Sequence, residues 1–413
     1  MAGDARFPSR SFLLYWRADA VSGLGTYVTL LALQMLVVVT LHGSALQVGW
    51  LNSVRWLPYL LVGVVVGALV DRRRRLPIMV ATDWAQAVLL AVIPLLWWLH
   101  LLSFPMLLAI VVLVYGTGSV INGAAAVALL PRLVDPQFLQ RAHARTDGTD
   151  AAASTAGPAL GGLLVSALGA PLAVVVDAAT YVYSAITVGR IKAAEPLPQP
   201  HRTGVTLGGE MLHGLRWIYR GSGLAGLALA THGWFVGNAI IGVVLAPYAL
   251  NNLGLTPFQF GLIGAAGGIG ALLGASITTR VGLVLGTGRT IIVCHVITTA
   301  GVLVMIAADL GLAQWPSVAI LAAGQLFYGL AMGMSNSHEM SYRQLVTPDD
   351  LQARTNTTMR SINRAVMVLV APLAGLAADR WGMRPALLVA ALVFGLVAAG
   401  LAATSFRTVR APA

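Results

Sequence analysis

The feature that most constrains this chain is a series of twelve apolar stretches, each near the ~20 residues that a helix needs to cross a bilayer. Only 10% of its 413 residues are charged and 57% are hydrophobic, a balance foreign to soluble domains of this size. We therefore predict an all-α membrane protein with twelve transmembrane helices. The stretches lie at residues 12–39, 46–70, 76–99, 104–127, 145–168, 171–190, 223–250, 257–279, 289–309, 316–338, 355–378 and 384–406.

The basic residues predict the orientation of these spans. All 26 are arginine except Lys192, and most of them gather at the termini and in alternate loops. Because short loops rich in arginine stay in the cytoplasm, both termini are expected there. Without bulky extramembrane domains, the chain is expected in a bacterial inner membrane. A net charge of +11 split among several loops does not form a nucleic-acid surface, so no nucleic-acid partner is expected.

Several functional classes lack their motifs in this chain. Cys294 is the single cysteine, which excludes an intrachain disulfide and a Cys-based metal site. His232 and His295 lie in different spans without ligand spacing, so no metal is expected. No phosphate loop, nucleophile elbow or zinc motif is present. We therefore expect neither an enzyme nor a self-contained ATP-driven pump, and no cofactor.

A proline-rich stretch divides the chain into two halves of six spans. Residues 191–222 are predicted to be a cytoplasmic linker with a short amphipathic helix, between bundles at 1–190 and 223–413. The halves resemble each other: Tyr115-Gly116 matches Tyr328-Gly329, and Gly157-Pro158 matches Ala371-Pro372. Such a parallel repeat predicts two pseudo-symmetric six-helix bundles.

Polar residues inside the spans are candidates for function, because they face a cavity or a partner helix. Helical spacing aligns Asp19 with Ser22 and Thr26 in the first span. Asp19 is predicted to be the proton-coupling carboxylate, unless a basic neighbour such as Arg17 keeps it ionised. Hydrogen bonds between helices explain most serine and threonine residues equally well. The predicted substrate-cavity residues are Tyr115, Asn122, Gln325, Tyr328 and Asn336.

Other charged residues in the spans have simpler interpretations. Asp83 is predicted to be structural, and Asp177 to be a packing or pairing group. Arg55 is expected to pair with a carboxylate. Glu339 has Arg343 four residues later, so a surface ion pair along one helix is expected.

The joint between the second and third spans carries a glycine and an acidic residue beside four arginines. On charge alone, Gly67, Asp71 and the arginines 72–75 indicate topology, although a gate latch would use the same groups. The pattern Gly67-x-Leu69-x-Asp71-Arg72-x-x-Arg75 resembles the loop between helices two and three of the major facilitator superfamily. Arg74 and Leu76 depart from that pattern, which has Gly and Lys there.

This resemblance implies a gate and a substrate cavity. Spans one, four, seven and ten line the cavity in that superfamily, between the two halves. Asp71 would latch the cytoplasmic side shut against the start of span eleven. The implied gating residues are Gly67, Asp71, Arg72, Arg75, Arg360 and Arg364.

The fifth span carries a second resemblance. Gly157, Pro158, Gly161 and Gly162 are similar to the antiporter signature of drug exporters, in which Ala153 would be a further glycine. A kinkable helix with a small-residue face is expected to pack against the other half. Over nearly its full length the chain resembles drug and siderophore exporters of the macrolide-efflux and enterobactin-exporter kind.

That resemblance implies proton-coupled export of lipophilic drug-like or natural-product molecules by alternating access. Its partners would be the small-molecule substrate, protons and the bilayer, and a monomer is expected. Two alternatives stay open. One is an exporter of a single defined metabolite, such as a siderophore or lysophospholipid, and the other is a transporter-fold sensor without flux.

Overall fold

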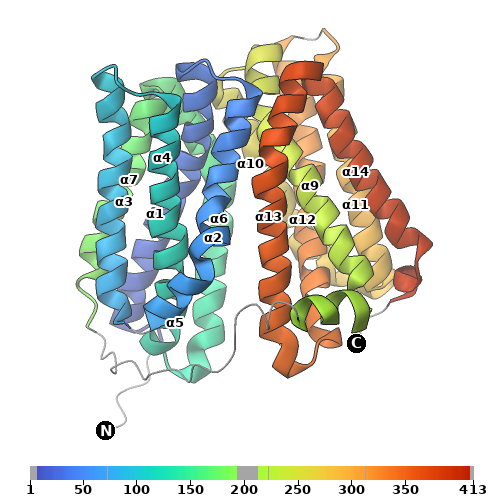
Figure 1. The fold of residues 1–413 in the computed structure, drawn as a ribbon, viewed down its shortest axis with the longest axis horizontal. Helices are drawn as coiled ribbons and strands as arrows, with labels where there is room; N and C mark the ends of the chain where they lie inside the picture. Colours follow the sequence, from blue (N-terminus) through green and yellow to red (C-terminus); the bar gives the residue numbers. More distant parts are fainter. Residues whose placement is uncertain (1–6, 72, 193–212, 222, 312, 410–413) are drawn as a thin grey trace. The chain divides into compact units, whose positions relative to one another are not determined.

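The computed structural model describes residues 7–71, 73–192, 213–221, 223–311 and 313–409. Within them, the side chains of residues 64, 65, 67–69, 71, 119, 350 and 353 are not described. All regular structure in these described ranges is helical (Figure 1). Each of the twelve predicted spans coincides with one helix or with helical segments that continue into one another, so the all-α prediction is confirmed.

Eleven of these helical rods are long and apolar enough to cross a membrane in the part of the chain that the structure describes. The twelfth is α2, a helix of 27 residues. The helices of the N-terminal part are α1 (Arg10–Met35), η1 (Leu36–Thr40), α2 (Ala45–Asp71), α3 (Arg75–Trp98), α4 (Phe104–Tyr115), η2 (Gly116–Asn122), α5 (Gly123–Leu133), η3 (Pro136–Phe138), α6 (Leu139–Leu168) and α7 (Ala170–Val188).

The C-terminal part contains a second set of helices, with short π-helical or 3-10 segments between some of them. They are η4 (Trp217–Gly221), α9 (Ala225–Pro247), η5 (Tyr248–Asn252), α10 (Pro257–Leu285), α11 (Thr287–Ile306), η6 (Ala307–Asp309), α12 (Gln314–Val346), α13 (Asp349–Trp381), α14 (Met383–Ala403) and η7 (Ser405–Thr408). Most of the predicted linker at 191–222 lies outside the described residues.

The chain forms two compact units. The first contains residues 1–42 and 54–201, and the second contains residues 43–53 and 202–413. The start of α2 therefore belongs to the second unit, and the rest of this helix belongs to the first. This division within one helix could not be read from the pattern of apolar stretches.

Glycine shapes three of the tight joints between consecutive spans. Gly169 separates α6 from α7, Gly286 separates α10 from α11, and Gly382 separates α13 from α14, with φ of 84°, 80° and 96°. A residue with a Cβ is strained at such angles, whereas glycine adopts them readily. Each joint reverses the chain within one residue, which leaves the flanking helices antiparallel neighbours in sequence.

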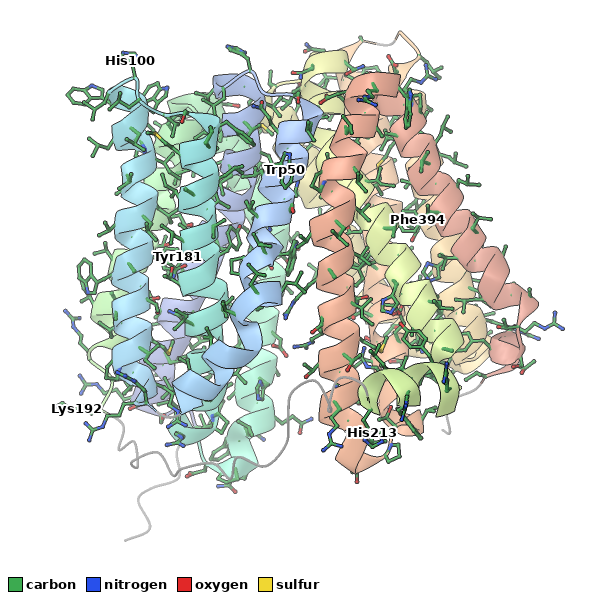
Figure 2. All side chains as sticks on the ribbon, in the orientation of Figure 1. Trp50, His100, Tyr181, Lys192, His213 and Phe394 are labelled. Atoms are coloured by element: carbon green, nitrogen blue, oxygen red, sulfur yellow. The ribbon has the colours of Figure 1, made fainter. Side chains whose placement is uncertain are left out.

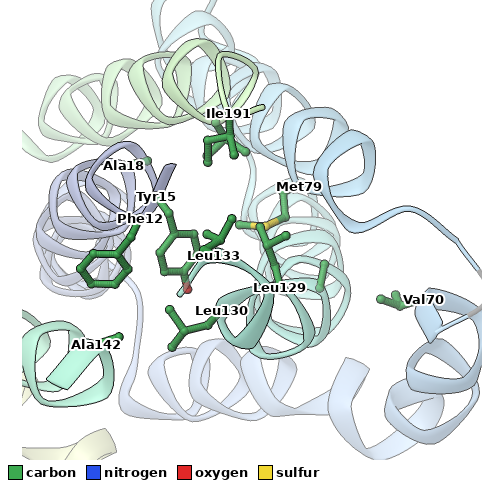
Figure 3. Packing of buried hydrophobic residues seen from close by; sticks show 12 residues of the cluster. Phe12, Tyr15, Ala18, Val70, Met79, Leu129, Leu130, Leu133, Ala142 and Ile191 are labelled. Carbon is green, nitrogen blue, oxygen red and sulfur yellow. The ribbon is translucent and has the colours of Figure 1, made fainter. Parts of the chain in front are cut away.

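The first unit has an apolar core near its N-terminal end. Phe12 and Tyr15 of α1 pack with Met79 of α3 and with Leu129 and Leu133 of α5 (Figure 3). Figure 2 places Lys192 and His100 at opposite ends of this unit, with Tyr181 between them along α7. Along α1, the residues of this core thus come directly before the polar residues of the next two turns.

Candidate functional site

A polar cavity of about 210 Å³ lies inside the first unit. Its wall is built from α1, α3, η2, α5 and α7, all of them span helices of the same unit. Charged and polar side chains inside a span are costly, so their convergence on one cavity is the strongest functional signal in this unit. The polar residues that line the cavity are Tyr15, Asp19, Ser22, Thr26, Asp83, Gln86, Asn122, Tyr181 and Ser184.

Asp83 of α3 is the most enclosed acidic group of this cavity, with an exposed fraction of 2%. Its Oδ1 accepts a hydrogen bond from Asn122 Nδ2 at 2.6 Å, and its Oδ2 accepts one from Ser184 Oγ at 2.6 Å. Asn122 also donates to Thr82 Oγ1. Three elements thus converge on one carboxylate, which is more than the structural role that the sequence predicts for Asp83.

Asp19 of α1 lies on the wall of the same cavity, and its side chain is exposed. Asp147 and Asp150 of α6 lie close enough to repel its negative charge. Two turns further along α1, Thr26 shares a hydrogen bond of 2.9 Å with Tyr181. The predicted polar stripe of the first span therefore faces a real cavity, together with a second carboxylate.

Asp177 of α7 is buried but does not line the cavity. It accepts a hydrogen bond from Thr180 Oγ1 at 3.0 Å. A Cβ on Gly25 of α1 would collide with the Asp177 carboxylate and the Thr180 hydroxyl. The prediction that Asp177 is a packing or pairing group agrees with this close contact.

The antiporter-like motif of α6 has a different partner from the one expected. Gly157 lies against Tyr27, and a Cβ on Gly161 would approach the Val28 carbonyl oxygen to 3.2 Å. Both neighbours belong to α1 of the same unit. Gly162 is also buried, and Pro158 lies within the helix. The glycine face of α6 thus packs on α1. Packing of this face against the other half was the expectation from the sequence.

Two further α1–α6 contacts reinforce this seam. Trp16 Nε1 donates to Thr149 Oγ1 at 2.9 Å, and the Arg145 guanidinium lies 4.1 Å from the centre of the Trp16 ring. Helical spacing identifies which residues share a face, but it does not identify the helix that the face meets.

The other predicted cavity residue of the first unit, Tyr115, lies under the guanidinium of Arg55 at 5.1 Å. Arg55 thus makes a cation–π contact with this ring, and its pairing with a carboxylate stays a prediction. Tyr115 ends α4, and Asn122 ends the π-helical segment η2 that follows it.

In the second unit, Tyr328 of α12 is buried among aromatic rings. Its hydroxyl donates to Asn238 Oδ1 at 2.6 Å, and its ring stacks on Trp234 and meets Phe394 edge-on. Gln325 lies beside Gly267 of α10, and Asn336 is exposed. The structure thus places the three predicted cavity residues of α12 in different environments.

Glu339 of α12 is attracted by Arg343, as the sequence predicts, and it also bonds to a second helix. Its carboxylate accepts hydrogen bonds from Thr231 of α9 and from Ser335, one turn earlier. Close by, His232 bonds to Tyr219 through Nε2 and to Asn363 through Nδ1. These bonds connect α9 with α12 and α13 within the second unit.

Half of the predicted gating residues lie outside what the structure describes. Arg72 and the side chains of Gly67 and Asp71 are among the residues left undescribed. Arg75 is buried at the start of α3, Arg360 of α13 is exposed, and Arg364 is half-buried. The latch therefore stays a prediction.

Many carriers have apolar helices around a polar cavity, but this fold is that of the major facilitator superfamily of transporters. A family model described as a transmembrane secretion effector matches residues 2–412. The chain therefore belongs to this family of major facilitator transporters.

Curated relatives have low identity to the chain. It is 27% identical to the uncharacterised MFS-type transporter y4rN of Sinorhizobium fredii over 343 residues, which cover 80% of each protein. It is 25% identical to macrolide efflux protein A of Streptococcus pyogenes over 222 residues, which cover 53% of each.

Solved structures share the fold at still lower identity. A bacterial homologue of the iron transporter ferroportin, in its inward-facing state, aligns with a TM-score of 0.73 and 14% identity over 95% of this chain and all of that one. The nucleoside transporter NupG aligns with a TM-score of 0.72 and 11% identity, over 96% and 99%. A bacterial homologue of the human lysosomal transporter Spinster gives 0.71 and 14%, over 97% of each.

Proposed function

We propose that this transporter is a secondary active exporter that moves lipophilic drug-like or natural-product molecules outward in exchange for protons. The observation that carries the proposal is the polar cavity of the first unit, where Asp19 and Asp83 face the same space. A carboxylate inside a membrane protein that can exchange with water is suited to bind and release a proton in each cycle. The macrolide-efflux relative supports the export direction and the substrate class.

The two carboxylates would act differently. Asp19 is exposed on the cavity wall, so it can exchange a proton directly. Asp83 is enclosed, and its two hydrogen-bond donors, Asn122 and Ser184, stabilise its charge. We assign the main coupling role to Asp19 and a second, positioning role to Asp83, whose bond holds Asn122 on the cavity wall.

The substrate would bind to aromatic and amide groups in an otherwise apolar pocket. Tyr115, Asn122, Gln325, Tyr328 and Asn336 are our candidates, since rings offer stacking area and amides fix orientation. The hydrogen bond from Asn122 to Asp83 offers a physical link between the substrate and proton sites.

The transport cycle would alternate access to the two membrane faces. We propose Gly67, Asp71, Arg72, Arg75, Arg360 and Arg364 as the cytoplasmic gate, with both termini in the cytoplasm of a bacterial inner membrane and a monomer as the working unit. Asp71→Asn should bias the protein towards the inward-open state, which solvent labelling of single introduced cysteines would measure.

Two other functions fit the same fold. An exporter of one defined metabolite, such as a siderophore or lysophospholipid, would show saturable flux for that compound and little for others. A transporter-fold sensor would bind its ligand without moving it.

Dye efflux in energised inverted vesicles, with and without a protonophore, separates these possibilities. We expect pumping that the protonophore abolishes. Pumping that survives the protonophore would contradict proton coupling, and specific binding without flux would favour the sensor.

A further inference from the structure

The start of α2 packs along the end of α13, inside the second unit. Residues 43–53 belong to this unit, although the remainder of α2 belongs to the first. The contact lies at the end of α2 opposite the arginine run at 72–75, so the predicted topology places it at the outer face.

Asp379, in the last turn of α13, caps the first turn of α2. Its Oδ1 accepts a hydrogen bond from the backbone N–H of Ala45 at 2.9 Å, and its Oδ2 accepts one from that of Leu46 at 3.0 Å. The first N–H groups of a helix have no partner within the helix, and they lie at the positive end of its dipole. One carboxylate therefore satisfies two backbone donors from a separate helix.

Small residues bring the two backbones together below this cap. A Cβ on Gly375 of α13 would collide with the Ala45 carbonyl oxygen, and a Cβ on Gly49 of α2 would collide with that of Ala371. One turn further, Ser53 Oγ donates to the Val368 carbonyl oxygen at 2.7 Å. The seam follows i, i+4, i+8 spacing along α2, so a single face of this helix makes all three contacts.

The sequence carries this arrangement as a motif that occurs twice. Gly375-x-x-x-Asp379-Arg380 ends α13 with the same spacing as Gly67-x-x-x-Asp71-Arg72 at the end of α2. The second span ends with this motif at the arginine-rich face, and the eleventh ends with it at the opposite face. In α13 this motif supplies the aspartate that caps the start of α2.

We propose that Asp379 is a gating residue and that its cap on α2 is a latch that breaks when the outer side of the transporter opens. The contact is suited to release, because its bonds are polar, Asp379 is exposed, and water can replace each bond on separation. The α2 helix passes from the second unit into the first at Val54, so a movement of the whole helix with the first unit would strain or break this seam.

The proposal rests on transport by alternating access, but the labelling test described below needs neither a substrate nor a proton gradient. A failure of proton-coupled export would therefore leave the labelling result standing, and the reverse also holds. Ser53 is a suitable reporter position, because its side chain is 2% exposed within the seam. In a Cys294→Ser background, the thiol of Ser53→Cys would be labelled by a membrane-impermeant reagent only when the seam opens.

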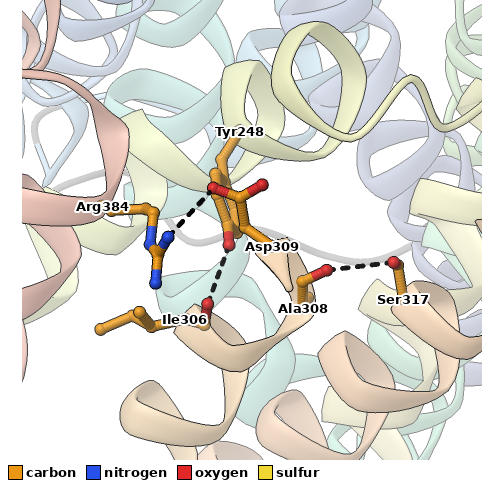
Figure 4. A network of polar contacts seen from close by, with 6 residues as sticks. All are labelled: Tyr248, Ile306, Ala308, Asp309, Ser317 and Arg384. Atoms are coloured by element: carbon orange, nitrogen blue, oxygen red, sulfur yellow. Dashed lines mark hydrogen bonds and ion pairs between the residues drawn. The ribbon is translucent and has the colours of Figure 1, made fainter. Parts of the chain in front are cut away.

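We expect Asp379→Asn to speed this labelling by about tenfold, since a charge-assisted bond to two donors is lost. The matched control is Asp309→Asn, which changes an aspartate at the same end of the second unit. Asp309 meets Arg384 of α14 at 3.6 Å (Figure 4). Equal labelling in the two variants would overturn the proposal.

General loosening of the fold is distinguished with the native thiol. Cys294 is 1% exposed in α11 of the same unit, and its labelling should stay unchanged in Asp379→Asn. If Cys294 becomes accessible in parallel with position 53, Asp379 is a structural residue and the latch is refuted.

A cross-link tests the same latch in the opposite direction. The pair Leu46→Cys and Asp379→Cys replaces two contacting positions, and an oxidised bridge between them would hold the seam closed. We expect flux to stop on oxidation and to return on reduction. Undiminished flux through the fully cross-linked protein would show that the seam does not open during transport.

Discussion

The two units use the same dipeptide in different ways. Tyr115-Gly116 in the first unit and Tyr328-Gly329 in the second occupy matching places in the sequence repeat. Gly116 has room for a Cβ, which would lie in ordinary van der Waals contact with Pro58 at 3.7 Å, and the chain continues as a π-helical segment. A Cβ on Gly329 would collide with the Gly267 carbonyl oxygen.

The environments beyond this pair differ in the same direction. Beside η2 the first unit keeps a polar cavity with two carboxylates. In the second unit α12 meets α10 backbone to backbone, because Gly270, Gly274 and Gly333 also permit close approach. The first unit thus keeps space around charged side chains. In the second unit, the glycines instead allow two helices to pack closely.

Among the variants that compare the two units, the largest effect is expected at Asp83, the enclosed carboxylate. Asp83→Asn should reduce gradient-driven export by at least about tenfold, because it removes a charge that holds two donors at the cavity wall. Asp177→Asn is the matched control, since Asp177 is equally buried but lies off the cavity. Initial rates of export, normalised to folded protein, measure the difference.

If Asp177→Asn lowers export as much as Asp83→Asn does, the cavity is not special and burial alone accounts for both losses. The first unit would then be a packed bundle like the second.

The matched glycines provide the next prediction. Gly329→Ala should destabilise the protein by about 1–3 kcal/mol, because the added methyl overpacks a backbone contact. Gly116→Ala should be neutral or mildly stabilising, since Gly116 has helical dihedrals and room for a methyl group. Thermal unfolding in detergent compares the two, and equal effects would contradict the difference in packing.

The smallest effect is expected at the two tyrosines. Tyr328→Phe removes a buried hydrogen bond to Asn238 and should cost about 1 kcal/mol of stability. Tyr115→Phe keeps the ring under Arg55 and should cost less. If these residues also contact substrate, each change should alter the order of preferred substrates more than protein abundance, which a panel of efflux substrates measures.

An equal loss for all substrates, in proportion to expression, would assign both tyrosines to packing alone. That outcome would limit the substrate site to the amide side chains.

Periodic features of the sequence predicted the spans and the polar stripe that carries Asp19. They failed where an answer depends on which helices become neighbours. The glycine face of α6 was visible, but its partner α1 was not. Asp83 was given a structural role because it lies near the cytoplasmic start of its span, although Asp83, Gln86 and Met79 share helical spacing and line one cavity.

The carboxylate of Asp379 was missed for a related reason. Its repeated motif is plain in the sequence, but its partners are backbone N–H groups, which leave no residue-type signal. Glu339 shows a similar omission, because the nearby Arg343 predicted a local pair but gave no sign of the bond from Thr231 of another helix. In both cases a contact between distant segments decided the role.

The central claim is that the first unit couples transport to protons through Asp19. The direct test compares gradient-driven accumulation with gradient-free substrate exchange, both in reconstituted vesicles that carry the Asp19→Asn variant. We predict that accumulation is lost, while exchange continues because the substrate groups remain. Undiminished accumulation by Asp19→Asn would contradict the account.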